Sequence, residues 1–430
     1  MAHQRTLPQY LAFLLYDFLL LLIYIPVTIK WGLWRQFYLS NKRYQRRGQR
    51  YGDIAEDLVE ADDWFHCVSV GEVVAASCVI KALLQEEPTR KITITTSTPT
   101  GAGRVRDIFG ETVQHHYLPW DLPWLINALI LALNPKRVFI TEVELWPNMI
   151  MKLAKHQIPI MLINARMTER SAQKYAQFSL LSEPVFAKIQ HVCAQGERDF
   201  EAYQQLGFGD DRLTLTQNIK FDQVTDIAVS DEVAKVGKSL VKRFVIVAGS
   251  THPGEEEHWL EVLEQCNIDD VLLVLVPRHP ERFDKVVSLL RDREIPFQRW
   301  SDYSDLADAT QVLLVDAMGV LSPLYHCADV AFVGGSIAER GGHNALEPAF
   351  FAVPILMGEH RYNNPVICAM LEQAGALYLT TSVEQSVERI CQWYDDPQAR
   401  IHAGQSGEQV LHANRGALSK TLEVIREKAQ

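Results

Sequence analysis

Residues 329–348, DVAFVGGSIAERGGHNALEP, contain the pattern that decides the fold. The apolar run at 330–333 has the length of a buried strand, and two glycine pairs follow it. Asn344 and Glu347 then lie three residues apart on a helix-like segment, so both point to one side. Because glycine lets backbone N–H groups approach an anion and a helix N-terminus adds positive charge, the stretch predicts a phosphate cradle.

Glu347 adds a second feature to this stretch, since a carboxylate at the mouth of the loop can accept hydrogen bonds from two ribose hydroxyls. The alternative is a glycine-rich turn that caps a buried strand, with Asn344 as a helix cap and Glu347 in solvent. The two glycine pairs together with the placed Asn and Glu favour a nucleotide site.

Short apolar runs alternate with helical periodicity on both sides of this stretch, which is typical of parallel α/β sheets. The expected strands are 65–70, 91–97, 137–141, 158–164 and 191–195, and then 244–248, 271–276, 311–315, 330–333 and 354–357. A polar stretch between the two series predicts two sheet domains of similar size, joined once, with a ligand cleft between them.

Ligands of parallel sheets bind beyond the carboxyl ends of the strands, so the residues after each strand are the candidates for a site. In the first half, the residues after the strands that we consider as possible ligand contacts are Ser69, Gly71, Thr98, Thr100, Gly101, Arg104 and Arg166. Glu72 follows the first strand at a turn into a helix, where partial burial would raise its pKa toward that of a general base. The alternative role of Glu72 is to stabilise the helix dipole.

Glu142 and Glu144 follow the strand at 137–141 and alternate, so one of the two is expected to face the ligand. In the second half, Arg278 could pair with a phosphate, and Met318 with Gly319 could pack against a base. His252 and His279 lack partners at zinc spacing and are interpreted as polar loop residues.

The net charge of −11 argues against nucleic acid as a partner, because phosphate backbones are bound by clustered Lys and Arg. The 7 cysteines are scattered, without a Cys-x-x-Cys pair, which predicts reduced core residues. An Asp-x-Asp sequence, the usual metal clamp for a nucleotide diphosphate, does not occur, so we expect no metal and no cofactor.

The segment 10–29, YLAFLLYDFLLLLIYIPVTI, is long enough as a helix to cross a bilayer. A run of Lys and Arg follows it between residues 30 and 50, which by the positive-inside rule places the rest of the chain in the cytoplasm and would attract anionic lipid. Length favours a spanning helix. Asp17 is expensive in mid-membrane, so a helix that lies in the interface is the alternative.

Taken together, the motifs resemble those of the Kdo transferases, membrane-associated GT-B glycosyltransferases that move 3-deoxy-D-manno-octulosonic acid (Kdo) from CMP-Kdo to lipid A precursors. The motifs that carry the resemblance are SVGE at 69–72, TPTG at 98–101, EVELWPN at 142–148, NAR at 164–166, KFD at 220–222, PRHPERF at 277–283 and the glycine-rich stretch at 332–348. The resemblance covers essentially the whole chain.

The resemblance implies a GT-B fold of two Rossmann-like domains that face a central cleft, with an N-terminal anchoring helix. It implies that Glu72 is the general base of an inverting, metal-independent transfer, supported by Glu142 and Lys220. It also implies that CMP is bound by Pro277, Arg278, Met318, Gly319, Val320, Asn344, Ala345, Leu346 and Glu347. One departure is visible, because Gln217 stands where the family usually has Gly.

The expected domains are an anchor at 1–36, an acceptor domain at 37–217, a linker at 218–242, a CMP-sugar domain at 243–408 and a C-terminal helix at 409–430. The expected partners are CMP-Kdo, a lipid A precursor and the anionic surface of the inner membrane, with the catalytic domains on the cytoplasmic face. The alternatives are a GT-B transferase that uses a UDP-sugar with another lipid, and a non-catalytic, membrane-tethered nucleotide-binding protein. A Rossmann oxidoreductase is disfavoured, since no Gly-x-Gly-x-x-Gly follows an early strand.

Overall fold

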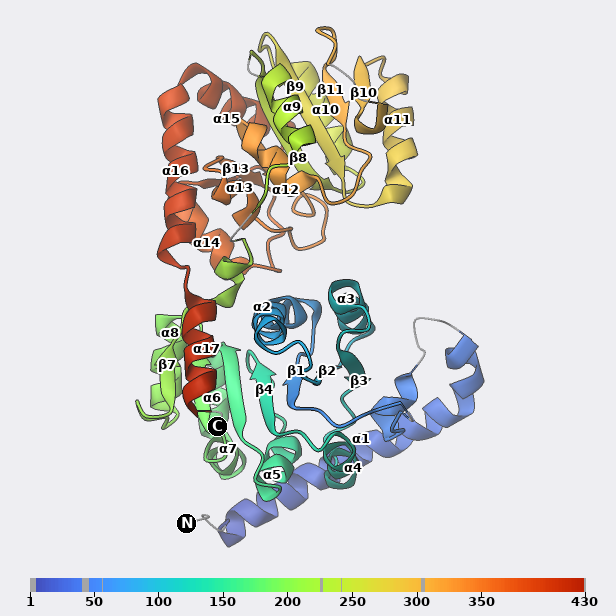
Figure 1. The fold of residues 1–430 in the computed structure, drawn as a ribbon, viewed down its shortest axis with the longest axis vertical. Coiled ribbons are helices and arrows are strands. Elements are labelled where there is room, and N and C mark those ends of the chain that lie inside the picture. The colour runs from blue at the N-terminus through green and yellow to red at the C-terminus, as the bar shows by residue number, and fades with distance from the viewer. Residues whose placement is uncertain are drawn as a thin grey trace. The chain divides into compact units, whose positions relative to one another are not determined.

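The computed structural model of the chain describes residues 5–40, 46–55, 57–224, 227–240, 242–302 and 306–428. The chain divides into two compact units, one made of Met1–Gln223 with Arg415–Gln430 and the other of Val224–Asn414 (Figure 1). The chain therefore passes between the units twice, whereas the sequence pattern predicted a single connection.

The first unit contains a parallel sheet of seven strands in the order β3-β2-β1-β4-β5-β6-β7. The strands are β1 (Asp63–His66), β2 (Ile92–Thr96), β3 (Gln114–Tyr117), β4 (Arg137–Thr141), β5 (Ile160–Ala165), β6 (His191–Ala194) and β7 (Leu213–Leu215). The helices are α1 (Leu7–Ser40), α2 (Val70–Glu86), α3 (Pro99–Phe109), α4 (Pro123–Leu133), α5 (Pro147–Lys155), α6 (Glu169–Gln177), α7 (Ser179–Phe186) and α8 (Glu197–Gln205), with 3-10 turns η2 (Arg47–Tyr51) and η3 (Ile219–Gln223).

The second unit repeats this plan with a parallel sheet in the order β10-β11-β9-β8-β12-β13-β14. Its strands are β8 (Phe244–Thr251), β9 (Val271–Pro277), β10 (Phe297–Arg299), β11 (Val312–Leu314), β12 (Val330–Val333), β13 (Ile355–Met357) and β14 (Leu377–Leu379). Its helices are α9 (Asp231–Leu240), α10 (Glu255–Gln265), α11 (Phe283–Asp292), α12 (Leu321–Leu324), α13 (Leu346–Phe350), α14 (Pro365–Gln373), α15 (Val383–Asp395) and α16 (Pro397–Ala413), with 3-10 turns η4 (Pro280–Arg282), η5 (Trp300–Asp302) and η6 (Tyr325–Cys327).

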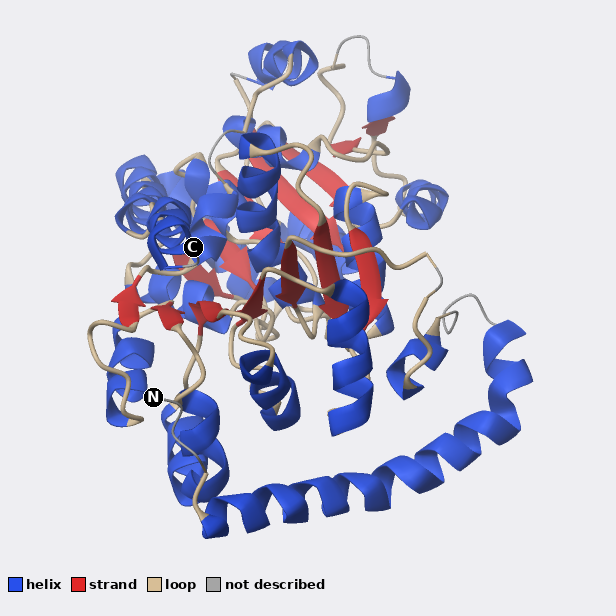
Figure 2. Cartoon of the chain, turned by 60° about the horizontal axis from the view of Figure 1, so that its bottom comes forward, coloured by secondary structure: helices blue, strands red, loops and turns tan. Residues whose placement is uncertain are grey.

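Each sheet is buried on both faces, which explains why its central strands are continuous apolar runs (Figure 2). In the first unit, Trp64 and Val138 belong to one buried cluster, while the adjacent Phe65 and Phe139 belong to another. This alternation follows from the two-residue period of a strand, and the helices on either side complete the two clusters.

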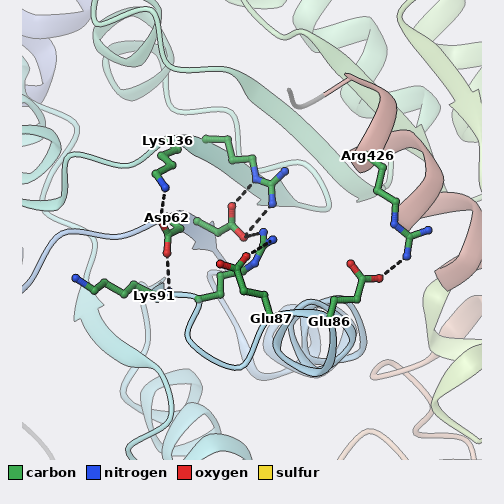
Figure 3. Close-up of polar contacts among 9 residues, drawn as sticks. Asp62, Glu86, Glu87, Lys91, Lys136 and Arg426 are labelled. Atoms are coloured by element: carbon green, nitrogen blue, oxygen red, sulfur yellow. Dashed lines mark hydrogen bonds and ion pairs between the residues drawn. The ribbon is translucent and has the colours of Figure 1, made fainter.

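The C-terminal segment forms two helices, α16 and α17 (Ala417–Lys428), which are separated at residues 414–416. Helix α17 belongs to the first unit, where the Asp222 carboxylate accepts hydrogen bonds from Gly416 N at 2.9 Å and Leu418 N at 2.6 Å. At its other end, Arg426 forms an ion pair with Glu86 at the end of α2 (Figure 3). The last helix is thus an integral part of the unit that contains Glu72.

Candidate active site

The strand order of the first sheet reverses direction between β1 and β4, because β2 and β3 lie on one side of this pair and β5 to β7 on the other. Such a reversal opens a crevice at the carboxyl ends of the two strands, where ligands of α/β sheets bind. Glu72 follows β1 and Glu142 follows β4. The topology therefore places these two predicted carboxylates at the same crevice.

Glu72 lies in the first turn of α2 and is only 6% exposed. Its carboxylate accepts hydrogen bonds from Val68 N at 2.7 Å and from the Ser69 hydroxyl at 2.9 Å. Burial raises the pKa of Glu72 to about 7, and the negative charge of Glu142 adds to this rise, while the two hydrogen bonds oppose it. At neutral pH the group therefore exchanges a proton readily, as a general base must.

Lys220 and Glu142 form an ion pair beside this turn, with 3.6 Å between Lys220 Nζ and Glu142 Oε1. The ammonium also approaches the first turn of α2, since a Cβ built on Gly71 would lie 3.8 Å from Lys220 Nζ. Glu142 has a φ of 61°, so β4 has already ended at Thr141. Burial raises the pKa of Glu144, and the charge of Glu142 adds to that rise.

The remaining candidate ligand contacts of the first unit lie after strands β2 and β5. Thr98 caps α3 by accepting a hydrogen bond from Gly101 N at 3.1 Å, and its hydroxyl donates to Val68 O at 3.2 Å. A Cβ on Gly101 would lie 3.0 Å from that hydroxyl, so both residues fix the turn after β2. Thr100 is exposed, and Arg104 and Arg166 are half-buried after β2 and β5.

The second sheet reverses direction between β8 and β12, so its crevice lies at the carboxyl ends of these two strands. The glycine-rich stretch follows β12, as predicted, but its first N–H groups bind a side chain of the protein itself. The buried Glu255 carboxylate accepts from the N–H groups of Gly335, Ser336, Ile337 and Ala338 at 2.8–3.1 Å, and from His252 N at 2.9 Å. The phosphate-cradle prediction is therefore wrong for residues 335–338, where an internal anion occupies the N–H groups.

The residues predicted to bind CMP lie at the ends of neighbouring strands of this second sheet. Pro277 and Arg278 are at the end of β9, Met318, Gly319 and Val320 follow β11, and Asn344, Ala345, Leu346 and Glu347 follow the glycine-rich stretch. Glu347 accepts two hydrogen bonds from side chains. One comes from Nδ2 of Asn344, which precedes α13, to Oε1 at 3.3 Å, and the other comes from the Ser322 hydroxyl to Oε2 at 2.6 Å. Burial raises the pKa of Glu347, and the charge of Arg278 is among the influences that oppose this rise.

Three histidines meet beside Arg278, which the sequence did not predict. His252 Nε2 and His343 Nε2 are 2.9 Å apart, with the two ring planes only 6° from parallel, and the His279 ring centroid lies 5.4 Å from that of His252. Burial lowers the pKa of His252 and of His343 to about 4, and neighbouring cations contribute. The pair is therefore neutral at pH 7, with one ring donating to the other.

Two parallel sheets, each with candidate ligand-binding residues at its switch point, are the architecture of the GT-B fold. UDP-GlcNAc 2-epimerase from Neisseria meningitidis, solved with UDP-GlcNAc, matches this fold with a TM-score of 0.54 over 85% of this chain and 99% of its own, at 13% identity. A family model described as "3-Deoxy-D-manno-octulosonic-acid transferase (kdotransferase)" matches residues 44–223.

Curated relatives extend this match to nearly the whole chain. The 3-deoxy-D-manno-octulosonic acid transferase of Haemophilus influenzae is 37% identical over 90% of this chain and 92% of its own. The enzyme of the same name from Bordetella pertussis is 28% identical over 92% of each chain. The chain belongs to the 3-deoxy-D-manno-octulosonic acid transferase family.

Proposed function

We propose that the protein transfers Kdo from CMP-Kdo to a lipid A precursor at the inner membrane, with inversion at the anomeric carbon. Membership of the Kdo transferase family supports the transferred sugar and its donor. The acceptor is proposed from the lipid-directed activity that the resemblance implies and from the apolar N-terminal helix α1.

The observation that carries the proposed mechanism is the placement of Glu72. A buried carboxyl group whose pKa is about 7 lies at the switch point of the first sheet, next to the Lys220–Glu142 ion pair. A carboxylate that only stabilised the dipole of α2 would not need to be buried, since this effect operates at the surface as well. Burial brings the pKa to the operating range of a general base instead.

In the proposed reaction, the ionised Glu72 takes the proton from an acceptor hydroxyl as its oxygen attacks the anomeric carbon of Kdo. The bond from that carbon to the phosphate oxygen of CMP breaks, and CMP departs with the bonding electron pair. Attack opposite to the leaving group inverts the configuration without a covalent intermediate. Lys220 offsets negative charge that develops on the reacting groups, and Glu142 orients the ammonium.

The donor is proposed to bind the second unit through the strand ends that surround Glu347. This carboxylate already accepts two hydrogen bonds from protein groups, and its remaining lone pairs can accept from the ribose hydroxyls. Arg278 supplies a positive charge for the CMP phosphate. Met318, which is 54% exposed, and the backbone of Gly319, with a φ of 85°, can pack against the cytosine.

The test is transfer of Kdo from CMP-Kdo, generated in place, to a tetra-acylated lipid A precursor, followed by mass analysis. We expect the product mass to rise by Kdo units and Glu72→Gln to lose about 10²–10⁴-fold in rate while it still binds CMP. Glu111→Gln is the matched control, because Glu111 is an exposed carboxylate in the same unit. If an active lipid gains no Kdo mass but accepts sugar from a UDP-sugar, the donor is a UDP-sugar and the proposal of CMP-Kdo is wrong. Full activity of Glu72→Gln would show that Glu72 is not the base.

A further inference from the structure

Helix α1 has two different faces, although its part from Leu7 to Lys30 is long and apolar enough on average to span a membrane. Residues 9, 13, 16, 17, 20, 24, 27 and 28 are buried or half-buried, and this spacing marks one side of a helix. The other side carries large apolar residues that are each about half exposed or more, among them Leu11, Leu15, Phe18, Leu22 and Ile29. We call these five residues the exposed stripe.

The inner side of α1 is attached to the first unit by specific polar contacts. The Tyr16 hydroxyl donates to Asp121 Oδ2 at 2.9 Å, and Asn148 Nδ2 donates to Asp17 Oδ1 at 2.7 Å. Asp121 itself is 2% exposed. Asp17, which is expensive inside a bilayer, thus has a buried hydrogen-bond partner, Asn148, in the first unit.

Further along the helix, the Tyr24 hydroxyl donates to Tyr51 O at 3.2 Å, and the Tyr24 ring meets the Trp120 ring edge-on at 6.0 Å. Together with the contacts of Tyr16 and Asp17, this attaches the central part of the helix to the first unit. Figure 1 shows α1 running beside α4 and α5, and Figure 2 shows it as one long helix along the same unit.

These contacts are incompatible with a helix that crosses the membrane. A span over Leu7–Lys30 would place residues 13–24 in the hydrocarbon layer, which is about 30 Å thick. Their polar partners, which are Asp121 before α4, Asn148 on α5 and Tyr51 O on η2, would then be drawn into the same layer, where polar groups and charges are expensive. A helix that lies in the interface keeps all of these contacts and exposes only the apolar stripe to lipid.

Positive charges line the groove where α1 meets the unit. Arg5, Lys152, Lys155 and Lys188 surround this groove together with Tyr10, Leu14 and Asp17. Cations along a helix that also exposes an apolar stripe match the boundary between anionic headgroups and acyl chains. A second copy of the chain could also cover the stripe. The basic residues of its groove would then lie near those of the first copy, and this repulsion disfavours a dimer.

We infer that α1 is an interfacial anchor, which lies in the plane of an anionic lipid surface on the side of the catalytic units and does not cross the bilayer. The inference rests on the membrane attachment in the proposed function and is independent of the transfer reaction. It reverses the expectation from helix length, because the contacts of Tyr16, Asp17 and Tyr24 use the side of the helix that a span would expose to lipid.

The topology is tested with a protease-cleavable tag placed before Arg5, on protein added to preformed vesicles of phosphatidylethanolamine and phosphatidylglycerol. If the helix is interfacial, the tag of vesicle-bound protein stays outside the vesicles. A protease added outside then cleaves the tag at the same rate before and after detergent is added. A tag that is protected until detergent is added means that α1 spans the bilayer, and this overturns the inference. Failure to bind the vesicles overturns both the inference and the proposed attachment, and a dimer in place of binding identifies a second copy as the occupant.

The exposed stripe is tested with the double variant Leu15→Asp/Phe18→Asp. We expect at least a tenfold loss of vesicle binding, with Kdo transfer to a detergent-solubilised acceptor within twofold of wild type. Ile401→Asp is the matched control, since Ile401 is a similarly exposed apolar residue on a helix of the second unit. Wild-type vesicle binding of the double variant would overturn the inference.

Discussion

The Lys220 ammonium lies 3.6 Å from the Glu142 carboxylate, and both side chains are largely buried, at 16% and 21% exposed. Lys220 is on η3 after the last strand of the first sheet, whereas Glu142 follows β4 near its centre. The pair therefore brings a positive charge from the edge of the sheet to its switch point, beside the turn that holds Glu72.

Removal of this positive charge is expected to slow the reaction. Lys220→Ala should lower kcat by about 10²–10³, the usual effect of losing one group that stabilises charge in a transition state. The control is Lys81→Ala, since Lys81 is an exposed lysine on α2. Steady-state kinetics on the lipid acceptor checks this, and equal rates for the two variants would show that Lys220 has no part in the reaction.

The pH dependence of the reaction should report the pKa of Glu72. The base must be ionised, so kcat/KM is expected to fall tenfold for each pH unit below about 7 and to level off above it. Ser69→Ala removes a hydrogen bond that lowers this pKa. The falling part of the pH profile, called the acid limb below, should therefore move to higher pH by up to about one unit.

Glu142→Gln provides the opposite shift, because it removes a negative charge that raises the pKa of Glu72. Because a shifted pKa changes the rate at any single pH, the variant is compared with wild type over the full profile of kcat/KM from pH 5.5 to 9. Shifts of Ser69→Ala and Glu142→Gln in the same direction would contradict the assignment of the limb to Glu72.

Glu255 is expected to be essential for the stability of the second unit. Its Oε1 accepts three backbone N–H groups and its Oε2 accepts two, so the amide nitrogen of Glu255→Gln must face at least two donors. Buried donors without acceptors should lower the free energy of unfolding by roughly 2–4 kcal/mol.

Urea unfolding of the full chain measures this loss, and Glu257→Gln is the matched control. Glu257 is on the same turn of α10, but it accepts from a single group, Gly254 N at 2.7 Å. Donor binding should also weaken, since the N–H groups that hold Glu255 begin the loop that leads to Asn344 and Glu347. Equal stability of the two variants would show that the N–H groups find other acceptors.

The sequence predicted the ten inner strands and failed on four, β3, β7, β10 and β14, which are the edge strands of the two sheets. An inner strand has neighbours on both sides and helices on both faces, so it is a continuous apolar run. An edge strand is partly exposed and mixes polar residues into a short segment, as Phe297–Arg299 does. The apolar pattern that identifies the inner strands is therefore absent at the edges.

The candidate site could be predicted where it depends on chain order, and not where it depends on tertiary packing. Glu72 follows a recognisable strand, so the rule for parallel sheets was sufficient to select it. The role of Glu255 could not be predicted from the sequence. Glu255 lies 80 residues before Gly335, and its carboxylate reaches the N–H groups of the glycine-rich loop only because β8 and β12 pair in the folded sheet. The His252–His343 contact spans 91 residues and has the same origin.

Gln217 offers a test of how the backbone positions Lys220. It has a φ of 72°, a left-handed conformation that favours glycine, and the resemblance implies Gly at this position. Gln217→Gly should therefore relieve strain of about 1 kcal/mol, partly offset by the greater freedom of glycine in the unfolded chain. Gln173→Gly, in the middle of helix α6, is the matched control and should lose about 1 kcal/mol.

Hydrogen–deuterium exchange over residues 213–223, together with kcat, measures both consequences. Slower exchange in Gln217→Gly with unchanged kcat is expected, because the turn keeps its shape and Asn218 Oδ1 still accepts from Lys220 N, at 3.0 Å in the native protein. Faster exchange and a fall in kcat would mean that the glutamine side chain, and not the left-handed backbone, holds Lys220 beside Glu142.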